Sequence, residues 1–145
     1  MCGVPQHTLE PYIEKLIEKG HRVAVAEQTE DPKLTKGLVK REVVRVVTPG
    51  TILNLNEKAN NYLVAVHQVG ATFGLAALDV TTGEFRLIEF DSKGELLNEI
   101  SRLNPPEFLV TKRFAEPLLG MRIELDDWQF DHKRALATLT KHFEV

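Results

Sequence analysis

The chain has 145 residues, enough for one domain or two small ones, and 43% of them are hydrophobic, enough for a real core. Its formal net charge of −3 excludes a general electrostatic attraction to nucleic acid, so any such binding must come from a local patch of cations. A single cysteine excludes an internal disulfide, no cysteine–histidine cluster has zinc spacing, and no apolar run reaches the roughly 18 residues of a membrane span. We therefore expect a cytoplasmic protein with no metal site and no membrane contact.

The first third of the chain predicts a helix followed by two strands. Apolar residues recur at helical spacing over residues 8–20, where we expect Thr8 to accept a first-turn amide through its hydroxyl. Gly20 is expected to end this helix in a left-handed conformation. A short apolar run predicts a strand over residues 21–28, and valines alternating with charges predict another over 38–47.

The tetrapeptide TPGT at residues 48–51 ends the second strand. Pro49 lacks a backbone donor, favours an extended conformation for the residue before it, and cannot lie inside a central strand. The residues that follow are polar and weakly patterned, so we place a boundary or linker near 49–59. The sequence therefore predicts two parts with separate sheets, residues 1–48 and residues 49–145.

The second part predicts three strands and then alternating helices and strands. Strands 61–69 and 72–80 are almost entirely apolar in their middles, which predicts cover on both faces of their sheet. Strand 83–90 is expected to form an antiparallel hairpin with the strand before it. The remaining expected elements are a helix at 92–104 that begins at a capping Ser92, a buried strand at 107–111, a helical turn at 113–120, a short strand at 121–127 and a helix at 131–143 that Asp131 caps. This order favours an α/β fold with a ribonuclease-H-like mixed sheet flanked by helices.

The densest basic charge of the chain lies between residues 33 and 45, where one acid, Glu42, interrupts five cations. The cations are Lys33, Lys36, Lys40, Arg41 and Arg45. A basic loop that leads into a basic strand could contact DNA phosphates, each contact adding salt-sensitive affinity. Cations in this number are also common on surfaces that bind nothing, and composition alone favours that second interpretation.

A ribonuclease-H-like sheet raises a metal-dependent nuclease as the alternative function. Asp79 ends an apolar strand where such a fold carries a catalytic carboxylate, and two-metal phosphoryl transfer needs further carboxylates beside it. The candidates are Glu84, Glu99, Asp126 and Asp127. No spacing in the sequence brings them together, so we predict no catalytic residue and expect Asp79 to cap the turn that follows it.

Several segments resemble the MutS family of bacterial DNA mismatch-repair proteins. They are "CGVPQH" (2–7), "VAVAEQTEDP" (23–32), "KGLVKREVVRVVTPGT" (36–51), "NYLVAV" (61–66), "LDVTTGEF" (78–85) and "LNPPEFL" (103–109). The resemblance covers essentially the whole chain. It departs from the family pattern at Gln6, where an aromatic residue is common.

The resemblance implies that residues 1–48 form the C-terminal part of a mismatch-recognition domain and residues 49–145 a ribonuclease-H-like connector domain. Members of the family bind mismatched or looped-out duplex DNA as dimers, use ATP with magnesium, and signal to the protein MutL. The family reads mismatches with a Phe-x-Glu motif, which is absent from residues 1–48, and its ATPase core is expected beyond Val145. We therefore expect a fragment that holds no cofactor, catalyses nothing and does not recognise mismatches by itself.

The resemblance also assigns candidate contact residues. Because it places the basic segment near DNA, we expect contacts with the DNA backbone from one set of residues. That set is Lys33, Lys36, Lys40 and Arg41, together with Gly3 and Pro5. The resemblance gives Asp79 no catalytic role, because the family's connector domain is not thought to be a nuclease.

For contact with MutL, the resemblance points to the exposed helix surfaces of the connector, above all to the polar side of residues 131–143. An apolar stripe on this helix is expected to face the core, and the candidate contact residues lie away from it. The stripe comprises Leu136, Leu139 and Phe143, and the candidates are Lys133, Arg134 and Thr138.

Overall fold

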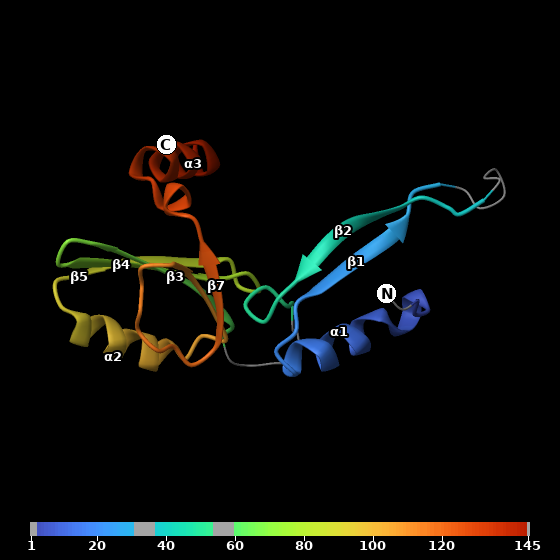
Figure 1. Cartoon of the computed structure of the whole chain (residues 1–145), viewed down its shortest axis with the longest axis horizontal. Helices are drawn as coiled ribbons and strands as arrows, with labels where there is room; N and C mark the ends of the chain where they lie inside the picture. The colour runs from blue at the N-terminus through green and yellow to red at the C-terminus, as the bar shows by residue number, and fades with distance from the viewer. Residues whose placement is uncertain (1–2, 31–36, 54–59, 145) are drawn as a thin grey trace.

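The computed structural model describes residues 3–30, 37–53 and 60–144, which form two bodies joined at a corner (Figure 1). The first body holds the 3₁₀ turn η1 (Gln6–Thr8), helix α1 (Leu9–Glu18) and strands β1 (Val23–Gln28) and β2 (Arg41–Val47). The second body holds strands β3 (Tyr62–Val69), β4 (Thr72–Asp79), β5 (Glu84–Phe90), β6 (Glu107–Thr111) and β7 (Met121–Leu125). Its helices are α2 (Lys93–Leu103), the 3₁₀ turn η2 (Asp127–Phe130) and α3 (His132–Phe143).

The first body is an antiparallel hairpin of β1 and β2 with α1 packed against it. Its small core consists of Ile13, Ile17, Val25 and Val47. Strand β2 leaves three valines more than half exposed: Val43, Val44 and Val46. The hairpin is therefore an arm that packs against α1 through Val25 and Val47 and is largely exposed elsewhere.

The C-terminal end of α1 matches the sequence prediction, but its N-terminal end does not. Gly20 has a φ of 76° and its amide donates to the Ile17 carbonyl at 2.8 Å, so the predicted left-handed ending is confirmed. The predicted cap is wrong, because the Thr8 hydroxyl donates to the Pro5 carbonyl at 3.0 Å and accepts no first-turn amide. The η1 turn precedes α1 directly, and this hydrogen bond holds the Thr8 hydroxyl within that turn.

The second body is a mixed sheet in the order β5-β4-β3-β6-β7. The first three strands are antiparallel neighbours, and β6 and β7 continue the sheet in parallel from β3. Helix α2 covers one face, where Val64, Leu75, Leu96 and Phe108 are almost fully buried. The mixed α/β architecture, the β4–β5 hairpin and the crossover through α2 are as predicted.

Two predictions about the second body are wrong. The face of the sheet opposite α2 is not fully covered, because burial alternates along β3 and β4 and every second residue stays partly open. Residues 113–120 form no helical turn; instead the Phe114 side chain is buried in the core and its amide donates to the Thr111 carbonyl at 3.1 Å. The buried Phe114 ring therefore anchors the loop of residues 113–120 to the core.

Helix α3 also differs from its prediction. Asp131 caps it by accepting the Arg134 amide at 3.0 Å, as expected. However, no described residue of the helix is buried, and Leu136 and Phe143 of the expected core stripe are 57% and 52% exposed. The helix stands away from the sheet (Figure 1), so its apolar residues share a face without having a full core to enter.

The corner between the bodies is a tight turn over residues 48–51. The Thr51 amide donates to the Thr48 carbonyl at 3.0 Å, and the Thr51 hydroxyl accepts the Thr48 amide at 3.0 Å. At the apex, the Gly50 amide donates to the buried carboxylate of Glu107 at 2.8 Å. A side-chain amide hydrogen of Asn61 reaches the Pro49 carbonyl at 2.9 Å. The turn is therefore bonded both internally and to the second body.

The Gly50→Ala substitution should destabilise the chain by about 1–3 kcal/mol, because overpacking at a tightly packed position forces neighbours to move. A Cβ atom at Gly50 would lie 3.0 Å from the Glu107 Cβ and 3.1 Å from the Leu63 Cβ. Gly94→Ala in α2 is the matched control, because a Cβ there meets nothing within 4 Å and alanine favours a helix. Urea unfolding followed by circular dichroism measures both; equal midpoints would contradict the close fit at the corner.

Candidate nucleic-acid interface and apolar groove

Lys40 and Arg41 lie at the free end of the β1–β2 hairpin, which points away from the second body (Figure 1). The backbone there is fixed: the Lys40 amide donates to Glu30 at 3.1 Å and the Lys40 carbonyl accepts the Thr29 amide at 3.0 Å. Both basic side chains stay exposed, although the Lys40 ammonium pairs with Glu42 at 2.6 Å. The arm therefore presents cations on an ordered backbone.

The other predicted DNA-contact residues divide into two groups. Gly3 and Pro5 are exposed and precede η1, at the N-terminal end of α1. In Figure 1 this end of α1 points the same way as the free end of the hairpin. Lys33 and Lys36 lie outside the described residues.

Arg45, the last cation of the basic segment, has a structural contact. Its guanidinium pairs with the Glu10 carboxylate of α1 at 2.5 Å, and both side chains remain partly exposed. The ion pair links the hairpin to its helix and lowers the charge that Arg45 offers to a ligand. Lys40 and Arg41 lie at the free end of the hairpin, whereas Arg45 is held against α1, so we place the candidate interface at Lys40 and Arg41 rather than along the whole of β2.

Asp79 has the capping role that the sequence predicts. Its buried carboxylate accepts the Thr81 hydroxyl at 2.6 Å and the amides of Thr81, Thr82 and Asn61 at 2.9, 3.3 and 3.2 Å. Burial alone would raise the pKa of Asp79, but the hydrogen bonds, first from Thr81, outweigh it and the pKa is lowered. The carboxylate is charged, and its hydrogen-bonding partners belong to the β4–β5 turn and to the residue just before β3.

The other acids of the nuclease hypothesis are engaged in separate pairs. Hydrogen bonds lower the pKa of Glu84, first from Tyr62 at 2.7 Å and then from Arg86. A hydrogen bond from Arg102 lowers the pKa of Glu99, whose side chain is only 15% exposed. Asp126 pairs with Lys112 at 3.8 Å and Asp127 with Arg113 at 2.9 Å.

These pairs leave the nuclease hypothesis unsupported. Across the described ranges, no three histidine, cysteine, aspartate or glutamate side chains come together as a cation site would require. Two-metal phosphoryl transfer needs such a convergence. Each acid is instead matched by neighbouring donors or by a cation, which is the arrangement expected of structural carboxylates.

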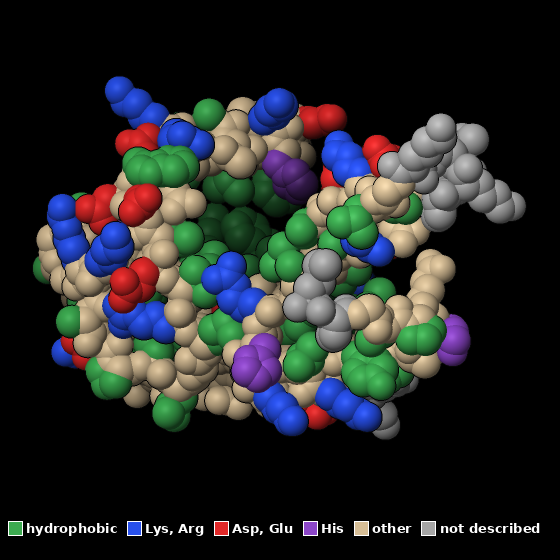
Figure 2. Space-filling view, turned by 45° about the vertical axis from the view of Figure 1, so that its right-hand side comes forward, with side chains coloured by type: hydrophobic (Ala, Val, Ile, Leu, Met, Phe, Trp, Pro, Cys, Tyr) green, Lys and Arg blue, Asp and Glu red, His purple; other side chains and the backbone are tan. Residues whose placement is uncertain are grey.

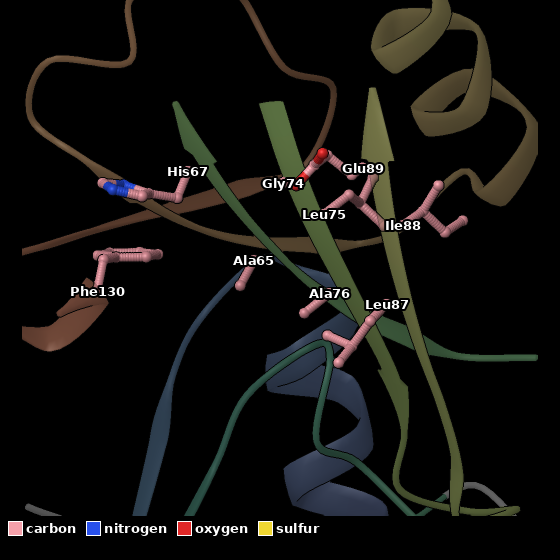
Figure 3. A pocket seen from close by; sticks show the side chains of 9 residues that line it. All are labelled: Ala65, His67, Gly74, Leu75, Ala76, Leu87, Ile88, Glu89 and Phe130. Carbon is pink, nitrogen blue, oxygen red and sulfur yellow. The ribbon is translucent and has the colours of Figure 1, made fainter. Parts of the chain in front are cut away.

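An apolar groove of about 400 Å³ opens on the sheet face opposite α2. Small residues form its floor, namely Ala65, Gly74 and Ala76, and Figure 2 shows a hollow lined by hydrophobic side chains. At one side, the rings of His67 and Phe130 lie face to face with centroids 4.9 Å apart (Figure 3). Sequence reasoning missed this groove, although small residues alternating along β3 and β4 are a signal that one sheet face is shallow.

The predicted partner surface on α3 is exposed. Lys133, Arg134 and Thr138 are all accessible, and the Arg134 guanidinium lies 4.5 Å from the Trp128 ring centroid, within cation–π range. Phe143 reaches back toward the sheet, with its ring centroid 6.2 Å from that of Phe85. The helix therefore presents a basic outer side next to the apolar groove.

Comparison with known proteins finds two family models along the chain. The model described as MutS domain I matches residues 1–56, and the one described as MutS domain II matches residues 61–145. Among curated relatives, each named DNA mismatch repair protein MutS, one from Protochlamydia amoebophila is 52% identical over 100% of this chain. Others are from Exiguobacterium sp. (58% identical over 86% of the chain) and Staphylococcus carnosus (51% over 81%).

The chain spans only 18%, 15% and 14% of the lengths of these three relatives. In the portion that the structure describes, every helix is too short or too polar to cross a membrane.

The Asp79→Asn substitution should cost about 1–3 kcal/mol at pH 7, because it places an amide group against three donor amides and a hydroxyl. The lowered pKa means that the carboxylate contributes stability in full above its unfolded pKa of about 4 and loses it as the pH falls through the folded pKa. The difference in unfolding free energy between wild type and Asp79→Asn should therefore become smaller below about pH 4.

Urea unfolding at pH 7 and pH 3 measures this effect. Asp91→Asn, at an exposed position, is the control and should stay within about 0.5 kcal/mol of the wild-type chain. An Asp79→Asn chain as stable as wild type at pH 7 would show that the four hydrogen bonds do not stabilise the turn.

Proposed function

The chain belongs to the MutS family of DNA mismatch-repair proteins, and from this premise we propose that it supplies a DNA-contacting arm and the body that connects this arm to the rest of a longer protein. The observation that carries the proposal is the exposed pair Lys40 and Arg41 at the end of an ordered hairpin, within the part that matches MutS domain I. We place the division between arm and connector at residue 48, with the corner as the start of the connector.

The proposed DNA contact is electrostatic and does not read sequence. Exposed lysine and arginine side chains bind phosphates by releasing condensed counterions, so affinity falls as salt rises. Discrimination of a mismatch needs a side chain that unstacks or probes the bases, and residues 1–48 contain no phenylalanine at all. We therefore propose duplex binding by this chain without preference for mismatches.

Specific recognition of mismatched or looped-out DNA, dimer formation and ATP use with magnesium are proposed for the longer protein. The chain contains no GxxxxGK[ST] phosphate-binding loop. Its candidate carboxylates are held by donors of their own, so we propose that it acts as a binding and coupling module and not as an enzyme. We place the longer protein in the bacterial cytoplasm, at the nucleoid.

For the partner MutL, we propose the basic side of α3 as a contact surface. Its exposed Lys133 and Arg134 stand on a helix that projects from the sheet, which leaves them accessible to a second protein. The capping Asp131 and the contact of Arg134 with Trp128 hold the start of this helix in place. An accessible, oriented charge pair of this kind sets the orientation and rate of association more than the affinity.

Duplex binding should be weak and steeply dependent on salt, with matched and mismatched 30-mers bound within about twofold of each other. Lys40→Ala and Arg41→Ala should each reduce the slope of log affinity against log salt by about 1, since each removes one phosphate contact. Fluorescence anisotropy between 50 and 200 mM salt measures the slope.

Lys93→Ala is the control for this experiment, because Lys93 lies on α2 in the second body and pairs with Glu116 at 2.6 Å. It should leave the salt slope unchanged. A strong preference for mismatched duplex, or wild-type slopes in both hairpin variants, would contradict the proposed role of the arm.

Charge reversal on α3, as Lys133→Glu with Arg134→Glu, should weaken the binding of purified MutL at least tenfold, measured by biolayer interferometry. Thr138→Ala should have a smaller effect, because it removes one hydroxyl and no charge. Lys19→Glu, at the exposed end of α1, is the matched control. With the helix content of the variant unchanged by circular dichroism, undiminished MutL binding would exclude this side of α3.

A further inference from the structure

The corner at residues 48–51 contacts both bodies, through different residues. Val47, just before it, is a core residue of the first body, and Ile52, just after it, packs against the same core. Gly50, at its apex, bonds to Glu107 of the second body. The chain thus leaves the first core, touches the second body and returns to the first core within six residues.

Glu107 is an unusual residue for this place. It begins the inner strand β6, between β3 and β7, and is only 2% exposed. A buried carboxylate is costly unless hydrogen bonds compensate it, and the Gly50 amide at 2.8 Å provides one that originates outside the sheet. The Glu107 side chain therefore bonds to the corner as well as packing within its own sheet.

The packing around the Gly50–Glu107 bond is close enough to fix the orientation of the turn relative to the second body. Gly50 lies so near the Cβ atoms of Glu107 and Leu63 that no side chain larger than hydrogen fits without movement. Asn61 holds the adjacent Pro49 carbonyl at 2.9 Å, and the hydroxyls of Thr48 and Thr51 lie 2.8 Å apart. Two hydrogen bonds to the second body, one with Glu107 at the start of β6 and one with Asn61 just before β3, therefore orient a turn that is itself internally bonded.

We propose that Glu107 is a positioning residue that locks the corner, so that the hairpin arm and the connector sheet move as one rigid body instead of swinging about a linker. The inference concerns how the two bodies are held, and it does not depend on DNA binding. Its consequence is mechanical: a displacement of the arm is transmitted to β6, in the interior of the sheet, through the Gly50–Glu107 bond.

The test compares one substitution that leaves an acceptor for the Gly50 amide with one that removes it. Glu107→Gln keeps a carbonyl oxygen for the Gly50 amide, whereas Glu107→Leu keeps similar volume and removes it. Spin labels on cysteines introduced at exposed positions 14 in α1 and 98 in α2 report the distance between the bodies by pulsed electron–electron double resonance. A Cys2→Ser background removes the native thiol. Amide hydrogen exchange at Gly50 reports the bond itself.

Wild type and Glu107→Gln should give one narrow distance distribution and a protected Gly50 amide. Glu107→Leu should at least double the width of the distribution and raise the Gly50 exchange rate at least tenfold, while Glu124→Leu, at an exposed site on β7, should change neither. Where Glu107→Leu does not fold, Asn61→Ala, which removes the bond to the Pro49 carbonyl, should broaden the distribution instead. A broad distribution in wild type, or a narrow one in every variant that folds, would overturn the proposal.

Discussion

The hydrogen bond between the Gly50 amide and the Glu107 carboxylate joins two cores that otherwise pack separately. One core lies under the hairpin arm and the other under the five-stranded sheet, and the buried residues of each cluster come from their own side of the corner, with the partly buried Ile52 also packing against the first. Orientation of the arm then depends on a few polar contacts made by a turn of four residues. A glycine at the apex is required for space, and a buried acid is required to satisfy its amide.

The sequence predicted those features whose causes are local. Asp131 and Ser92 cap their helices by accepting amides three residues ahead, and Asp79 holds its own hairpin turn. These contacts depend on residues close together in the chain, so the pattern of residue types is sufficient to predict them. The mixed sheet followed from the order of strands and helices, because a strand–helix–strand unit has one favoured arrangement.

The features that sequence missed depend on distant neighbours. Periodicity showed that Leu136 and Phe143 share a face of α3, but not that both side chains stay more than half exposed instead of entering a core. The sequence predicted a buried strand from Glu107, but not the hydrogen bond that its carboxylate accepts from a glycine 57 residues earlier. Lys40 and Arg41 could be predicted as exposed cations, whereas the ion pair of Arg45 with Glu10 required the fold of α1 onto the hairpin.

Residual dipolar couplings test most directly whether the corner joins the two bodies rigidly. Backbone amides of the described residues in both bodies would be measured in one weakly aligned sample of the 145-residue chain. If the corner is locked, a single alignment tensor should fit the couplings of α1, β1 and β2 together with those of the five-stranded sheet. Two tensors of clearly different magnitude, one for each body, would mean that the corner is a flexible linker.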